Sequence, residues 1–177
     1  MKVLQLLPIG EVPGETLHRL GSAMAEEFRV PCEIIPWRLD PKFALHGERG
    51  QFHSSELLRR MQEYVRPESW RVLGVTDVDL YIPILTFVFG EAQMGGPCAV
   101  VSAHRLKQEF YGLPPDNDLL GSRLLKESVH EVGHTLDLTH CEDYRCAMAP
   151  SHAVEWIDLK DSALCSACES KSSVATR

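Results

Sequence analysis

The chain has 177 residues, of which 44% are hydrophobic and 24% are charged, and its formal net charge at pH 7 is -7. This composition is ordinary for a globular protein and argues against a fibrous or disordered chain, and the length suffices for one domain whose core needs no disulfide staples. The negative charge, without a cluster of Lys and Arg, argues against nucleic acid as a partner.

The N-terminal residues and the cysteines indicate in which cellular compartment the protein is located. The first ten residues, MKVLQLLPIG, lack the long apolar run and the small-residue cleavage site of a signal peptide. The longest mostly apolar stretch, residues 82–89, is too short to span a bilayer as a helix. Without a signal peptide, six cysteines favour thiolate metal ligands or buried thiols over disulfides. We therefore expect a cytoplasmic monomer that does not associate with membranes.

The first half of the chain alternates strand-like and helix-like segments. Apolar residues recur at helical spacing after Pro13, which suits the first turn of a helix. In chain order the pattern predicts a strand at 2–7, this helix with Leu17, Leu20, Met24 and Phe28 on one face, a strand at 32–35, a helix at 54–64, and strands at 70–76, 85–89 and 99–102. This order predicts an α/β fold with a mixed, mostly parallel sheet.

A long helix is predicted after the sheet region. Pro114 and Pro115 end that region, and Asp116 or Asn117 can cap the next helix. One face of this helix carries an apolar stripe that belongs to the core, made of Leu125, Val129, Val132 and Leu136. A second helix-compatible segment follows at residues 154–164.

The predicted long helix contains His130-Glu131-Val132-Gly133-His134. Its two histidines are one helical turn apart, so both imidazoles can reach one ion at a zinc–nitrogen distance of about 2 Å. His140 follows six residues later and supplies a third imidazole if the chain leaves the helix and turns back. Three histidines leave a fourth position for a water whose pKa zinc lowers to about 7, and Glu131 is placed to accept its proton.

Chance is a poor explanation for this pattern. His-Glu-x-x-His would occur in about 3% of shuffled chains of this composition. A further histidine at the sixth following position lowers the chance to roughly one in several hundred. We therefore predict a catalytic zinc site that hydrolyses a peptide bond.

Four cysteines form a second candidate site. Cys141-x4-Cys146 and Cys165-x2-Cys168 supply four thiolates, which close a tetrahedral zinc site with no open position. Such a site is structural. Because Cys141 adjoins His140, a zinc ion on the cysteines would fix the backbone that presents His140, which couples the two sites. We expect two zinc ions per chain.

The sequence HEVGHTLDLTHC, then Cys146-x-Met148, then CSAC resembles the archaemetzincin branch of the metzincin zinc peptidases. The resemblance extends from about residue 86 to residue 168 and implies the same two ligand sets, with Glu131 as the base. It also implies that Met148 is the Met-turn residue beneath the catalytic ion. The implied fold is a single metzincin-like domain over residues 1–177. Its upper subdomain would cover about 1–136, and a small zinc-stapled lower subdomain would cover 137–177.

One residue departs from the family pattern. The metzincin motif HExxHxxGxxH has glycine at the turn where this chain has Asp137. Positive φ costs an ordinary residue about 1 kcal/mol, but Asp tolerates the left-handed region better than most residues. Asp137 also falls on the metal-facing side of the helix, so it is a candidate partner of a ligating histidine or an alternative third ligand. We choose His140 as the third ligand.

The expected substrate is a peptide or protein that lies extended along an edge strand. Two other functions are compatible with the same motifs. One is a zinc-containing binding or regulatory protein with little proteolytic activity, which the altered turn at Asp137 would permit. The other is a zinc hydrolase that acts on small non-peptide amides.

Overall fold

The computed structural model describes residues 1–175, and the side chains of residues 1–172. A five-stranded sheet has the order β2-β1-β5-β8-β7, and a smaller sheet has the order β3-β4-β6. In the larger sheet the first four strands are parallel and β7 is antiparallel to β8. The strands are β1 (Val3–Ile9), β2 (Cys32–Ile34), β3 (Leu45–His46), β4 (Gln51–His53), β5 (Ser69–Thr76), β6 (Leu80–Tyr81), β7 (Gly90–Ala92) and β8 (Cys98–Ser102). The predicted mixed, mostly parallel sheet is confirmed.

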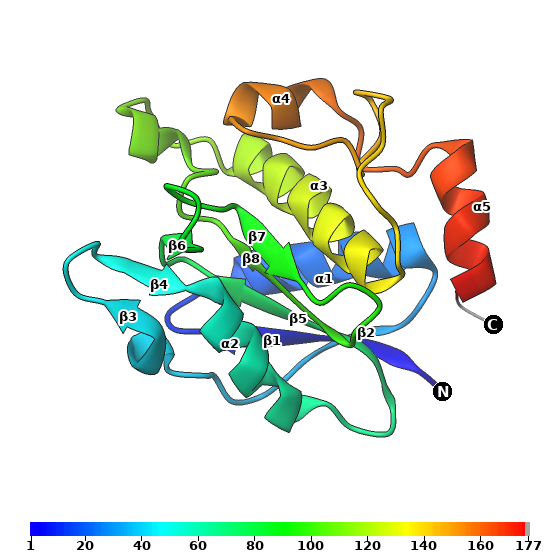
Figure 1. The fold of residues 1–177 in the computed structure, drawn as a ribbon, viewed down its shortest axis with the longest axis horizontal. Coiled ribbons are helices and arrows are strands. Elements are labelled where there is room, and N and C mark those ends of the chain that lie inside the picture. The colour runs from blue at the N-terminus through cyan, green and yellow to red at the C-terminus, as the bar shows by residue number, and fades with distance from the viewer. Residues whose placement is uncertain (176–177) are drawn as a thin grey trace.

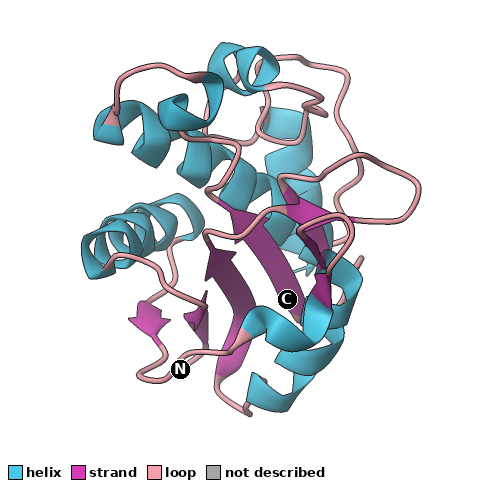
Figure 2. Ribbon diagram, turned by 90° about the vertical axis from the view of Figure 1, so that its left-hand side faces the viewer, coloured by secondary structure: helices cyan, strands magenta, loops and turns pink. Residues whose placement is uncertain are grey.

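Helices cover both faces of the larger sheet (Figures 1 and 2). They are α1 (Gly14–Phe28), α2 (Ser54–Met61), α3 (Asn117–Thr135), α4 (Val154–Leu159) and α5 (Ser166–Ala175), with short 3-10 helices at Pro41–Ala44, Gln62–Tyr64 and Gln108–Tyr111. None of the described helices combines the length and the apolar composition that crossing a bilayer requires.

The alternation of side chains along the strands builds two cores. On β1, Leu4 and Leu6 pack with α1 and α3 on one face, whereas Leu7 and Ile9 pack with α2 on the other. All four of these residues are fully buried. Because both faces of the central strands are covered, these strands are nearly continuous apolar runs.

The long helix α3 begins as the sequence predicts. Asp116 is its N-cap, and its side chain accepts a hydrogen bond of 2.9 Å from the amide of Leu119. Val129 and Val132 of the predicted stripe are buried in the core shared with α1. The helix therefore crosses the sheet with the opposite face free to line a site.

Two predicted elements differ from the structure. Residues 85–89 do not form a strand: side chains take up the carbonyl groups of Leu85 and Thr86, and Val88 makes only an isolated bridge with Leu80. The helix predicted at 154–164 ends at Leu159, because the backbone turns extended at Lys160 and carries that side chain into the interior.

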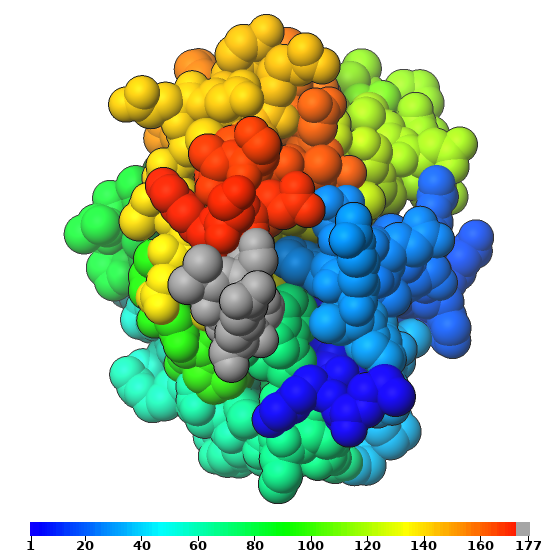
Figure 3. All heavy atoms as spheres, turned by 90° about the vertical axis from the view of Figure 1, so that its right-hand side faces the viewer, coloured from blue at the N-terminus to red at the C-terminus, as the bar shows by residue number. Residues whose placement is uncertain are grey.

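The last part of the chain returns to the end of α3. Figure 3 shows α5, in red, on the surface beside the yellow segment that follows α3. The sulfur atoms of Cys141 and Cys165 lie 3.8 Å apart at this junction. Helix α5 has a polar composition without an apolar stripe, so the sequence pattern does not indicate it.

Candidate metal centre and cleft

Three histidines converge at the end of α3. The nitrogen atoms that His130, His134 and His140 offer as ligands all lie within 4.8 Å of one another. His130 and His134 are one turn apart on the helix, and their Nε2 atoms are 3.0 Å apart. The chain leaves the helix after Thr135 and turns back, which brings His140 to the same point. His130 is buried, whereas His140 is exposed.

The hydrogen bonds of two of these rings define where their protons are. Nδ1 of His130 lies 2.8 Å from the carbonyl oxygen of Ala147, and Nδ1 of His134 lies 2.8 Å from that of Leu138. A carbonyl oxygen only accepts, so each Nδ1 carries the proton and each Nε2 presents a lone pair. Two lone pairs that face each other across 3.0 Å repel unless a cation lies between them. The donor set therefore fits a zinc ion.

The surroundings keep these rings neutral. Burial lowers the pKa of His130 well below its ordinary value, and the positive charge of Lys160 lowers it further. Burial also lowers the pKa values of His134 and His140. Neutral imidazole is the form that binds a metal.

Glu131 lies next to the histidines on α3 and lines the same cleft. Burial raises the pKa of its carboxyl group well above the ordinary value, and the charge of Glu127 raises it further. A carboxylate whose pKa is raised is a stronger base than an exposed one. Glu131 therefore has both the position and the environment of a general base.

The turn after α3 is made by Asp137. Its φ is 63°, so it adopts the left-handed conformation for which the family motif has glycine. Its carboxylate packs against Gly95 rather than toward the histidines. The histidine cluster of the described residues includes His140 and not Asp137.

The four cysteines also converge. The sulfur atoms of Cys141, Cys146, Cys165 and Cys168 all lie within 4.8 Å of one another. The amides of Met148 and Cys165 donate hydrogen bonds to Sγ of Cys146, at 3.4 and 3.3 Å. A backbone hydrogen bond from Cys168 lowers the pKa of Cys165 to about 7. Burial raises the pKa of Cys146, and the two amides directed at its sulfur act against that rise. Four convergent sulfur atoms fit a tetrahedral zinc ion.

A cleft of about 540 Å³ opens above the histidines. One wall is the segment from Leu85 through β7, and the opposite side includes Pro150 and His152. Strand β7 is the outer strand of the sheet and pairs with β8 in the described part of the chain. Its residues Gly90, Glu91 and Ala92 line the cleft, where an edge strand offers backbone groups for an extended peptide.

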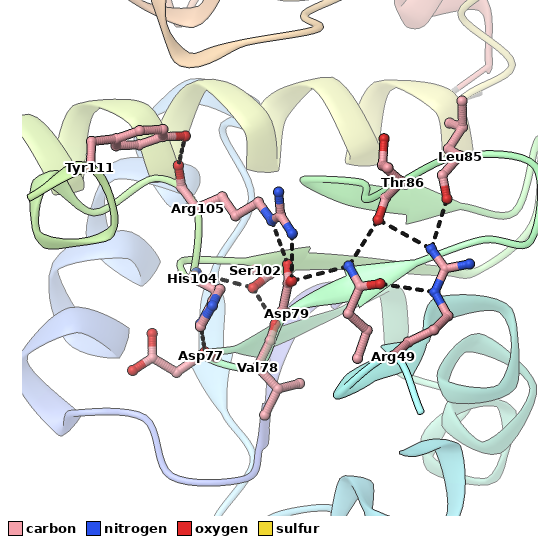
Figure 4. Close-up of polar contacts among 11 residues, drawn as sticks. Arg49, Asp77, Val78, Asp79, Leu85, Thr86, Ser102, His104, Arg105 and Tyr111 are labelled. Atoms are coloured by element: carbon pink, nitrogen blue, oxygen red, sulfur yellow. Dashed lines mark hydrogen bonds and ion pairs between the residues drawn. The ribbon is translucent and has the colours of Figure 1, made fainter. Parts of the chain in front are cut away.

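A polar network holds the rim of this cleft (Figure 4). Nη2 of Arg49 donates to the carbonyl oxygens of Leu85 and Thr86, at 2.9 and 3.1 Å. Nε2 of Gln51 donates to Thr86 O at 2.9 Å and to Asp79 at 3.0 Å. The carboxylate of Asp79 in turn accepts hydrogen bonds from Nε and Nη2 of Arg105, each at 2.8 Å. The network therefore fixes the carbonyl groups of Leu85 and Thr86, just before the backbone hydrogen bonds that hold Val88 and Phe89.

A family model described as Peptidase family M54 matches residues 48–173. The chain belongs to peptidase family M54. Relatives named archaemetzincin extend the match to nearly the whole chain. The archaemetzincin of Methanocaldococcus jannaschii is 44% identical over 164 residues, which are 93% of this chain and 89% of that protein. That of Thermococcus kodakarensis is 42% identical over 177 residues, covering 97% and 95% of the two chains.

Solved structures of M54 relatives share the fold. The crystal structure of archaemetzincin from Methanopyrus kandleri has a TM-score of 0.86 at 34% identity, covering 99% of this chain and 95% of that one. The Archaeoglobus fulgidus archaemetzincin, complexed with malonate, has a TM-score of 0.82 at 34% identity, covering 97% and 99%. These matches confirm the metzincin-like α/β fold and the archaemetzincin resemblance.

Family membership makes the chain a zinc metallopeptidase, a hydrolase of peptide bonds, whose substrates are peptides or proteins. Neither a binding protein nor an amide hydrolase is favoured by these comparisons. The structure brings together the predicted histidines and the predicted cysteines of this M54 peptidase. It also places the predicted Met-turn residue, Met148, fully buried with its sulfur against Gly133 of the helix.

The sequence pattern does not reveal three charged residues near the site. Glu127 lines the cleft one turn before Glu131, and Lys160 forms an ion pair with it. Glu91 of β7 accepts hydrogen bonds from the hydroxyl groups of Ser54 and Ser55 at the start of α2. The one local signal in the sequence is that Glu127 shares the helix face of the two histidines, opposite the apolar stripe.

Proposed function

We propose that His130, His134 and His140 hold the catalytic zinc ion of this peptidase and that Glu131 is its general base. The observation that carries the proposal is the pair of Nε2 atoms 3.0 Å apart, whose rings both donate from Nδ1 to carbonyl groups. Two facing lone pairs need a shared cation. Met148 would support the site from below, where its buried sulfur packs on Gly133.

Each part of the site then has a separate role in peptide-bond hydrolysis. When bound, zinc lowers the pKa of a water ligand to about 7 and polarises the scissile carbonyl group. Glu131 accepts the proton of the attacking water and returns it to the leaving amine. The substrate backbone pairs with β7, which places the scissile bond above the histidines. Asp137 makes the turn and does not bind the ion.

We further propose that Cys141, Cys146, Cys165 and Cys168 hold a second, structural zinc ion. The four sulfur atoms within 4.8 Å and the amides directed at Cys146 support this assignment. The amide of Cys141 also donates to the carbonyl oxygen of Met148 at 3.0 Å. The thiolate site would therefore hold both His140 and Met148 in place, which couples the two ions.

The remaining expectations concern organisation and compartment. We propose one metzincin-like domain over residues 1–177, with an upper subdomain of about 1–136 and a lower subdomain of 137–177 that carries the second zinc. Six free cysteines suit the reducing cytoplasm. We propose that the protein works there as a monomer, without nucleic acid.

The decisive experiment compares wild type with Glu131→Gln on a library of diverse peptides. We expect the variant to keep both zinc ions and to lose about 10²- to 10⁴-fold in kcat, which is the usual contribution of a general base. Glu26→Gln, an exchange on α1 away from the cleft, is the matched control. Equal rates in wild type and Glu131→Gln would contradict the assignment. Cleavage of short amides but not of peptides would favour the amide hydrolase.

Zinc stoichiometry tests the ligand sets separately. We expect two ions in wild type and one in His140→Ala, with the remaining ion held by the cysteines. One ion in wild type, or two in His140→Ala, would contradict the assignment of the two clusters.

A further inference from the structure

Lys160 is fully buried, although it lies just past the last turn of α4, a helix that lies over α3 (Figure 1). Its ammonium group donates to two backbone carbonyl oxygens, those of Ala147 and Ala149, each at 3.1 Å. These two residues flank Met148. One side chain therefore binds the backbone on both sides of the residue that packs beneath the histidines.

The carbonyl oxygen of Ala147 links Lys160 to the metal centre. It accepts the hydrogen bond from Nδ1 of His130 at 2.8 Å and the one from Lys160 at 3.1 Å. The position of this oxygen decides how the His130 ring is turned, because the ring donates to it. By fixing this oxygen, Lys160 also fixes the direction of the Nε2 lone pair of His130.

Glu127 completes the arrangement from the helix side. Its Oε1 lies 2.8 Å from Lys160 Nζ, and the side chains of Lys160 and Glu127 are only 0% and 4% exposed. Glu127 belongs to the same helix as His130 and precedes it by one turn. The ion pair therefore ties the segment around Met148 to α3.

A buried ion pair usually contributes little net free energy to folding. The cost of removing both charges from water commonly cancels their attraction, and well-packed apolar residues often serve as well or better. The pair here has a second role available, because the same ammonium group binds the backbone that orients a histidine. This geometry separates it from surface pairs such as Arg59 with Glu56.

We propose that Lys160, held by Glu127, is a positioning residue that fixes the His130 ring and the Met148 turn beneath the catalytic zinc. The proposal rests on the three-histidine zinc site proposed above. Lys160 touches neither substrate nor metal and acts through Ala147 O. Its loss weakens the binding of zinc by the histidines more than the binding of zinc by the cysteines.

The test measures zinc release in the double variant Lys160→Met/Glu127→Gln, which keeps the volume of both side chains and leaves no unpaired charge in the core. The holoenzyme is mixed with the chelator 4-(2-pyridylazo)resorcinol, and an organomercurial then frees the zinc held by cysteines. The zinc held by the histidines is called the histidine pool, and the zinc held by the cysteines the thiolate pool. The variant His140→Ala should lack the histidine pool, which identifies that pool in the release traces. We expect this pool to leave the double variant at least tenfold faster than wild type, as is usual for the loss of a residue that orients a ligand.

Two single variants test Glu127 and a neighbouring lysine separately. Glu127→Gln removes the counter-charge but keeps the donors of Lys160, so its release rate should fall between those of wild type and the double variant. Lys126→Met is the matched control, because Lys126 also reaches from α3 to a backbone carbonyl of α4, that of Ile157. It should release zinc at the wild-type rate, and in the double variant the thiolate pool should be accelerated less than the histidine pool.

Three results would overturn the proposal. These are a wild-type release rate in the double variant, an equal acceleration in Glu127→Gln, or an equal acceleration of the thiolate pool, which would indicate general loosening. If His140→Ala instead lacks no zinc pool, the three-histidine site itself is wrong. The experiment thus distinguishes failure of the proposed role of Lys160 from failure of the proposed metal centre.

Discussion

The carboxylate of Asp137 packs on the Cα of Gly95. A Cβ added to Gly95 would lie 2.5 Å from Oδ1 of Asp137, and the amide of Gly95 donates to the carbonyl oxygen of His134 at 3.1 Å. Both residues have positive φ, 63° for Asp137 and +64° for Gly95. The loop before β8 and the turn after the active-site helix therefore fit together only because position 95 has no side chain.

Gly95→Ala should consequently be strongly destabilising. The clash and the positive φ together should lower the free energy of unfolding by about 3 kcal/mol. Gly112→Ala is the matched control, because φ is +74° there and nothing lies within 4 Å of the added Cβ. It should cost about 1 kcal/mol.

A denaturant titration of the double variant Gly95→Ala/Asp137→Gly isolates the contact. Relative to Asp137→Gly, the alanine should then cost only about as much as it does at position 112, about 1 kcal/mol. If the cost at position 95 were unaffected by the removal of the carboxylate, the contact would not be its cause.

Two glycines of α3 should respond to alanine in opposite directions. At Gly121 the new Cβ meets only the flexible end of Arg19 at 3.2 Å, so the helix gains up to about 1 kcal/mol of stability. At Gly133 it would lie 2.3 Å from Sδ of the buried Met148. Gly133→Ala should therefore lose about 1–3 kcal/mol and part of its zinc, measured by urea unfolding and metal analysis. A gain at both positions would mean that Met148 does not pack tightly on the helix.

The rim network should affect substrate binding more than turnover. Arg49→Met removes the donors to Leu85 O and Thr86 O and keeps the aliphatic part of a side chain whose guanidinium lies 3.9 Å from the centroid of the Tyr81 ring. We expect KM for peptides to rise by about tenfold with kcat and zinc content unchanged. Arg59→Met, on the exposed face of α2, should leave both constants as they are. A fall in kcat alone would place the network in the chemical step.

Two cysteines outside the thiolate cluster should be unreactive in the folded protein. Burial raises the pKa of Cys32 to about 11 and that of Cys98 to about 12. At pH 8 their thiolates are then only about 10⁻³ and 10⁻⁴ of the total, and the thiolate is the nucleophile. Iodoacetamide should spare both at pH 8, and raising the pH should label Cys32 before Cys98.

Mass spectrometric mapping of the labelled peptides measures this order. Protein unfolded in guanidinium chloride, where all six thiols regain ordinary pKa values, is the control. Rapid labelling of Cys98 at pH 8 in folded protein would contradict the burial of that thiol.

The sequence by itself determined the features that depend on local spacing. His130 and His134 share a helix face because they are four residues apart, and Asp116 caps that helix because its side chain reaches an amide three residues on. Alternating apolar segments similarly predicted the order of the main elements, β1, α1, β2, α2, β5, β8 and α3, but not the short strands β3, β4, β6 and β7. Each of these follows from the geometry of a single element, which the residues of that element specify.

Only the tertiary structure decided which distant side chains meet. Lys160 reaches Glu127 and Ala147 because α4 lies over α3. Residues 85 and 86 stay irregular because Arg49 and Gln51 take up their carbonyl groups. Asp137 keeps the turn at a position where the motif has glycine because Gly95 makes room for its carboxylate. These contacts join segments with no fixed spacing, so their energies depend on packing that no local pattern encodes.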